Sequence, residues 1–102
     1  MADVSVTNNT QANQFEFTVD GKTAVLQYKL RPGRIAFLHT EVPKEMEGHG
    51  IGGRLAQTGL EYAAAQGLKV APLCPFVASY IKRHREFANL AAEEYRAGLW
   101  GE

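Results

Sequence analysis

Four glycines fall within six residues of this 102-residue chain, in the run Gly-His-Gly-Ile-Gly-Gly at positions 48–53. The run lies between a predicted strand that Pro43 ends and a helix predicted from the spacing of Ile51, Leu55 and Gly59. Glycines let the backbone approach a ligand closely, and the first amides of a helix have no acceptor within the helix. Residues 48–53 therefore predict an anion site suited to a pyrophosphate, with a flexible connection as the simpler structural alternative.

Two nucleotide-binding motifs do not fit this run. Gly48, Gly50 and Gly53 have the spacing of the dinucleotide fingerprint, but residues 43–47 separate the first glycine from the preceding strand. A P-loop requires lysine after its last glycine, and here Arg54 stands there.

Alternation of apolar and polar residues predicts an antiparallel meander before the glycines. Three segments show the period of two that is typical of half-buried strands: 15–19, 24–31 and 35–42. Asp20 with Gly21, and Pro32 with Gly33, predict the two tight turns between them.

The rest of the chain predicts a helix that Gly67 ends, a short marginal strand over 68–73, a second helix to about His84, and a helical tail over 90–95. The expected fold class is therefore α/β, with a mixed, mostly antiparallel central sheet of about five strands and two main helices. We expect one domain over residues 1–102.

Composition limits the function classes. Eleven basic residues balance eleven acidic ones, which argues against a nucleic-acid partner. No signal peptide or membrane span is recognised, and a single cysteine suits a reducing compartment, so we expect a cytoplasmic protein without a membrane partner. The three histidines lack a metal-ligand spacing, so we expect no metal.

The order of elements around the glycines resembles the GNAT N-acetyltransferase superfamily, whose signature Gln/Arg-x-x-Gly-x-Gly/Ala holds the pyrophosphate of acetyl-CoA. Gly50 and Gly52 match the Gly-x-Gly part, and Glu47 stands at the Gln/Arg position. Further segments are similar to the motifs of a minimal, single-domain subfamily of predicted acetyltransferases: 39–43, 72–77 and 80–84. The resemblance covers residues 14–90 and leaves 1–13 and 91–102 as terminal segments.

The resemblance implies an enzyme that moves an acetyl group from acetyl-CoA to an amine acceptor, either a small molecule or a protein. The superfamily's tyrosine acid falls on Ile81 here. A non-catalytic acyl-CoA-binding or sensing module and a protein-interaction domain are the alternative interpretations. The predicted cofactor-binding residues are Gly48, His49, Gly50, Ile51, Gly52, Gly53, Arg54 and Arg83, although Arg83 also suits the negative end of a helix dipole.

Acetyl transfer to an amine needs a base for the amine and a proton for the leaving thiolate. His39 and Glu41 are the candidate bases, and we expect both on the strand face that carries Ile35 and Phe37. Cys74 is predicted to begin the second helix, where amide dipoles increase thiol reactivity, and is a candidate nucleophile or acid. The structural alternatives are a half-buried histidine, a solvated strand end and a packed thiol.

Overall fold

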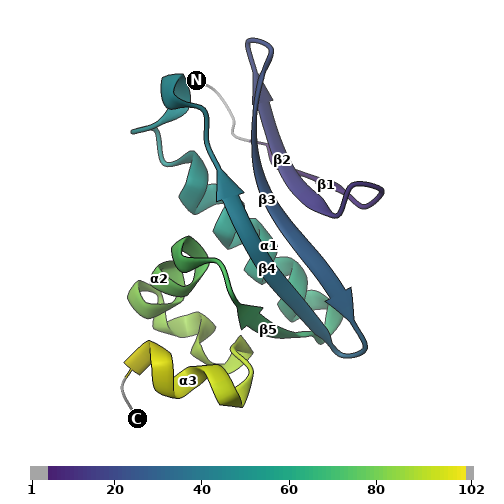
Figure 1. The fold of residues 1–102 in the computed structure, drawn as a ribbon, viewed down its shortest axis with the longest axis vertical. Helices are drawn as coiled ribbons and strands as arrows, with labels where there is room; N and C mark the ends of the chain where they lie inside the picture. Colours follow the sequence, from purple (N-terminus) through teal and green to yellow (C-terminus); the bar gives the residue numbers. More distant parts are fainter. Residues whose placement is uncertain (1–4, 101–102) are drawn as a thin grey trace.

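The computed structural model describes residues 5–100, which form a five-stranded sheet flanked by helices (Figure 1). The strands lie in sequence order: β1 (Thr7–Asn9), β2 (Gln14–Val19), β3 (Lys22–Arg31), β4 (Arg34–Glu41) and β5 (Lys69–Pro72). The helical elements are the 3₁₀ helices η1 (Lys44–Met46) and η2 (Arg85–Leu90), and the α-helices α1 (Ile51–Gln66), α2 (Pro75–Arg83) and α3 (Glu93–Trp100). Of the predicted terminal segments, 1–13 includes residues 1–4 and 91–102 includes residues 101–102, which lie outside the described range.

The sheet is mixed, as predicted. Strands β1 to β4 pair antiparallel, and β5 pairs parallel to β4 after the crossover through α1. Asp20 and Gly21 have φ values of 52° and 76°, so the β2–β3 hairpin turns through two left-handed residues, which matches the twist of the strands. Gly33, with φ of 72°, supports the β3–β4 turn. Both predicted turns are confirmed.

The core lies between the sheet and α1. Alternate residues of β2, β3 and β4 pack against one stripe of the helix, whose buried residues are Ile51, Leu55, Ala56, Gly59, Leu60 and Ala63. Gly67 adopts φ of 69°, and its N–H donates to the carbonyl oxygens of Ala63 and Ala64, which ends the helix as predicted.

The pairing of β3 with β4 contains a register shift. Tyr28 pairs with Phe37 and Leu26 pairs with Thr40, so β4 has one more residue than β3 between these pairs. The extra residue is Leu38, which is 42% exposed. Such a bulge reverses which side chains of the strand point to each face. Because paired residues point to the same face, Thr40 shares the helix-covered face with Leu26.

The predicted face of His39 and Glu41 is therefore wrong. Ile35 and Phe37 are fully buried on the α1 side, whereas His39 and Glu41 lie beyond the bulge, are exposed and point to the opposite face. They still share a face with each other. Strict alternation assumes that every residue of β4 pairs regularly with β3. The spacing of residues does not show where a bulge leaves one residue unpaired, and after that residue the faces are exchanged.

The C-terminal elements close the β5 edge of the sheet. The N–H of Ala92 donates to the carbonyl oxygen of Val70 at 2.8 Å, which continues the hydrogen bonding beyond β5. Arg34, at the start of β4, donates to both carboxylate oxygens of Glu94 on α3, at 2.5 and 2.9 Å. The predicted marginal position of β5 is confirmed, with the tail covering its outer edge.

Two helical glycines provide a matched test of this packing. A Cβ on Gly59 would lie 2.9 Å from Cε1 of the buried Phe37 ring and 3.2 Å from a methyl carbon of Leu26, whereas a Cβ on Gly98 of α3 meets nothing within 4 Å. We expect Gly59→Ala to lower the free energy of unfolding by about 1–2 kcal/mol despite the better helix propensity of alanine. Gly98→Ala should raise it by about 0.5 kcal/mol. Urea denaturation measures both, and equal effects would contradict the packing.

Candidate functional site

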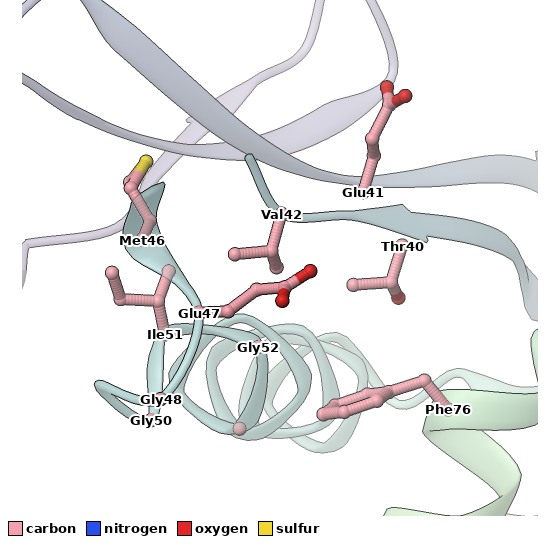
Figure 2. A pocket seen from close by; sticks show the side chains of 11 residues that line it. Thr40, Glu41, Val42, Met46, Glu47, Gly48, Gly50, Ile51, Gly52 and Phe76 are labelled. Carbon is pink, nitrogen blue, oxygen red and sulfur yellow. The ribbon is translucent and has the colours of Figure 1, made fainter. Parts of the chain in front are cut away.

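A cavity of about 520 Å³ lies where β4 ends beside the beginning of α1 (Figure 2). Three segments and one aromatic ring surround it: Thr40, Glu41 and Val42 after the bulge; Met46, Glu47 and Gly48 around η1; Gly50, Ile51, Gly52 and Gly53 in the first turn of α1; and Phe76 of α2. The sequence did not indicate Thr40, Val42, Met46 or Phe76 as site residues, because these side chains meet only in the folded chain.

The glycine run presents helix amides to this cavity. Gly48 and Gly50 have φ values of 85° and 73°, a left-handed backbone that favours glycine. Gly50 precedes α1 without any side-chain cap, and its carbonyl oxygen accepts the N–H of Arg54 at 3.1 Å. The N–H groups of the first turn before Arg54 lack an intrahelical acceptor, and the helix dipole adds positive potential. An anion in the cavity would therefore be stabilised by these free N–H groups and by the positive potential of the helix dipole.

The remaining predicted cofactor-binding residues lie at different places. His49 lines a second cavity of about 270 Å³, together with residues of the β2–β3 hairpin. Arg54 and Arg83 are not among the lining residues of the first cavity, but both act electrostatically on Tyr80. The pKa of Tyr80 is raised by burial and by the nearby carboxylates of Glu86 and Glu61, and the two arginines oppose this rise. Arg54 on α1 and Arg83 on α2 therefore lie within electrostatic range of the same phenol group, as do the two carboxylates.

Close packing explains one of the two glycines in the first turn of α1, Gly52. A Cβ on Gly52 would lie 2.9 Å from Cζ of Phe76, so the ring can rest against the helix backbone only where a side chain is missing. A Cβ on Gly53 would lie at an ordinary 3.7 Å from the ring of Tyr80. Phe76 thereby forms one wall of the cavity (Figure 2).

Two carboxylates border the cavity, and they point in opposite directions. The side chain of Glu47 reaches into the space between β4 and α1, whereas that of Glu41 points away to the other side of the strand (Figure 2). Among the described residues that line the cavity, these two are the ones that carry charge. The departure from the Gln/Arg signature at position 47 was the sequence signal for this negative charge at the cavity.

Cys74 lies behind the cavity wall. Its thiol is buried at 2% exposure, and its Sγ lies 3.2 Å from Oγ1 of Thr40, which does line the cavity. The N–H of Cys74 donates to the carbonyl oxygen of Phe37 at 2.8 Å, and Pro75 begins α2 directly after it. The predicted place of Cys74 at the start of this helix is confirmed. Ile81, where the resemblance would place a tyrosine acid, is fully buried in the core.

The sheet opens next to Cys74. β4 pairs with β5 only from Arg34 to Phe37, so the β5-facing edge of β4 beyond Phe37 has no strand partner within residues 5–100. Thr40 faces the cavity at this opening, and His39 and Glu41 lie beside it on the other face. Residues on both faces of β4 therefore lie next to the point where its pairing with β5 ends.

Residues 5–100 offer neither a metal cluster nor a membrane-spanning helix. They contain no cluster of three or more His, Cys, Asp or Glu side chains arranged to hold a metal ion. Nor does any helix in this range combine the length and apolarity that crossing a bilayer requires.

The contact between Gly52 and Phe76 gives a prediction about the shape of the cavity. Gly52→Ala should tilt the Phe76 ring outward, because that ring is 38% exposed and can move, whereas Gly53→Ala should leave it in place. Relative to Gly53→Ala, the Gly52 variant should be less stable by about 1 kcal/mol. Ring proton shifts of Phe76 and thermal denaturation of both variants measure this. An unmoved ring in Gly52→Ala would contradict it.

Comparison with known families agrees with this geometry. The profile of the GCN5-related N-acetyl-transferase family matches residues 14–90, which include the meander, the glycine run, α1, β5 and α2. No curated protein sequence matches the chain. With three quarters of its length matched by that profile, and with a mixed sheet and a helix N-terminus open to a cavity, the chain belongs to the GCN5-related N-acetyltransferases.

Proposed function

We propose that this protein transfers the acetyl group of acetyl-CoA to an amine. Family membership supports acetyl transfer in general, and the observation that supports the donor is the cavity at the uncapped N-terminus of α1. The acceptor is a small-molecule or protein amine, and we place the reaction in the cytoplasm because a single cysteine suits a reducing compartment.

The charge and polarity of the cavity lining suggest how the donor is oriented. Its pyrophosphate binds the amides of residues 48–53, where the backbone is open and the helix dipole is positive. Its pantetheine arm follows the apolar wall of Val42, Met46, Ile51 and Phe76 toward Thr40. We assign Arg54 and Arg83 to phosphate groups outside the cavity, since both cations act electrostatically on Tyr80, whose ring packs beside Gly53. Glu47 opposes the anion, so binding is moderate rather than tight.

The acceptor approaches from the other face of the sheet. The acetyl group reaches the opening between β4 and Cys74, and His39 and Glu41 lie on the open face beside that opening. Glu41 accepts the proton of the amine, with His39 as its neighbour on the same face. The bulge supports the binding of donor and acceptor on opposite faces of the sheet. It keeps Thr40 on the donor face, whereas both candidate bases lie on the acceptor face.

A non-catalytic acyl-CoA-binding module is the second candidate function. The observation that favours it is Ile81, a buried aliphatic residue at the position where the superfamily carries its tyrosine acid. Binding of acetyl-CoA without transfer to any member of an amine panel would favour this module. A failure to bind coenzyme A would instead favour the protein-interaction alternative.

Donor binding is tested with two variants that change the charge near the proposed pyrophosphate site in opposite directions. Titration with coenzyme A should shift the amide NMR signals of residues 48–53. Gly50→Asp adds a negative charge next to the pyrophosphate and should weaken binding about tenfold or more, whereas Glu47→Gln removes one and should strengthen it about three- to tenfold. Both effects should decrease at high salt. Glu93→Gln removes the same charge on α3, whose residues do not line the cavity, and should change nothing. Figure 1 shows α3 at the end of the fold opposite the beginning of α1.

The result that contradicts this assignment is a set of amide shifts centred elsewhere, or equal affinities in Glu47→Gln and Gly50→Asp. The two variants change the charge at the helix N-terminus by one unit each, in opposite directions, and aspartate is among the few residues that accept the left-handed backbone of Gly50. Charge at the helix N-terminus therefore predicts opposite changes, whereas a general loss of folding predicts two losses.

The base assignment is tested on the open face. Glu41→Gln should lower kcat by about 10²-fold or more while leaving the dissociation constant for coenzyme A unchanged. Glu16→Gln is the matched control, because Glu16 lies on the same face two strands away, through Val25, and not beside the opening. If Glu41→Gln and His39→Gln both keep the rate and the pH profile of the unmodified protein, neither residue is the base.

A further inference from the structure

Thr40 is the residue that connects the cavity with the buried thiol. Its hydroxyl oxygen lies 3.2 Å from Sγ of Cys74, and its side chain lines the cavity. Cys74 itself is 2% exposed and is not one of the lining residues. A proton that passes between the thiol and a group in the cavity therefore has the Thr40 hydroxyl on its direct route.

This placement depends on the bulge in β4. Without the extra residue at Leu38, alternation from Phe37 would turn Thr40 to the open face, away from Cys74 and from the cavity. With the bulge, Thr40 points toward α1, and Figure 2 shows it on the same side of the strand as Val42 and opposite Glu41. The N–H of Cys74 donates a hydrogen bond to the carbonyl oxygen of Phe37 at 2.8 Å. This bond holds Cys74 beside the segment of β4 that contains Thr40.

We propose that Thr40 and Cys74 together supply the proton that the coenzyme A sulfur takes up when acetyl transfer breaks the thioester. This inference rests on the proposed function and assigns the acid that Ile81 cannot provide. Tyr80, the neighbouring tyrosine, packs beside Gly53 and does not line the cavity. Thr40 is the catalytic residue of the pair, since it contacts the cavity, and Cys74 acts through it.

The proton balance is complete without another reactant. The amine nitrogen forms a bond to the acetyl carbon, the carbon–sulfur bond breaks, and its electron pair stays on the coenzyme A sulfur. That sulfur takes the proton of the Thr40 hydroxyl, and the hydroxyl oxygen takes the proton of the Cys74 thiol. The amine loses one proton through its base to solvent, and one proton returns from solvent through the Thr40 hydroxyl to the Cys74 sulfur, so each turnover yields one amide and one coenzyme A thiol.

The first experiment measures transfer in matched variants. Thr40→Val removes the hydroxyl and keeps the shape, Thr40→Ser keeps the hydroxyl, and Cys74→Ala removes the thiol. We expect Thr40→Val to lower kcat about 10²-fold with an unchanged dissociation constant for coenzyme A, and Thr40→Ser to stay within about threefold of the unmodified protein. Because the two groups act in series, the Thr40→Val/Cys74→Ala double variant should be no slower than Thr40→Val alone.

The second experiment needs no acceptor. Ultraviolet absorbance of the thiolate follows the titration of bound coenzyme A, and a hydroxyl that donates to the sulfur stabilises its ionised form. The titration midpoint should rise by about one pH unit in Thr40→Val and should be restored in Thr40→Ser. The titration midpoint separates the proposed acetyl transfer from the proposed contact between Thr40 and the sulfur. A shifted midpoint without any transfer would overturn the proposed function and support the Thr40 contact.

Three results would overturn the inference. The first is an unchanged rate and midpoint in Thr40→Val, and the second is a Thr40→Ser variant that behaves like Thr40→Val. The third is an acetyl group found on the protein by mass spectrometry after incubation with acetyl-CoA and missing in Cys74→Ala, because it would make the thiol a nucleophile rather than a proton source.

Discussion

The register shift in β4 is the constraint on which the rest of the site depends. A strand has only two faces, so one inserted residue changes the face of every side chain that follows. In this chain the insertion falls at Leu38, directly before the segment that borders the cavity. It turns Thr40 and Val42 toward α1 and leaves His39 and Glu41 on the open side. The donor side and the acceptor side of the proposed reaction are therefore separated by one backbone irregularity.

The second constraint is the close approach of α1 to its neighbours. Gly59 lets the buried ring of Phe37 contact the helix backbone, and Gly52 does the same for Phe76. One contact fixes the helix on the sheet and the other fixes a wall of the cavity against the helix. Because interiors are packed without free space, a side chain at either glycine must displace an aromatic ring. The position of the helix N-terminus, and with it the direction of its free amides, follows from these contacts.

Electrostatics at the cavity combine attraction with opposition. The amides at the start of α1 favour an anion, and the cations Arg54 and Arg83 both act electrostatically on Tyr80. Glu47 reaches into the same space with a negative charge (Figure 2). A transferase must release coenzyme A after each turnover, and product release sets the rate of many enzymes. In the proposed function, a carboxylate near the pyrophosphate suits that requirement better than the strongest possible binding would.

The sequence by itself determined the local features of this protein. Period-two alternation, the Asp20-Gly21 and Pro32-Gly33 turns and the helical stripe after residue 50 reflect interactions between near neighbours, so the mixed sheet and its helices were predictable. The glycine run marked the first turn of α1 for the same reason. Tertiary structure alone decided the register of β3 against β4, because inserting one residue alters no local preference. It therefore decided that Thr40 meets Cys74, 34 residues away, and that Phe76 closes the cavity. Such contacts depend on how distant segments fill one volume, which the spacing of residues along a chain does not contain.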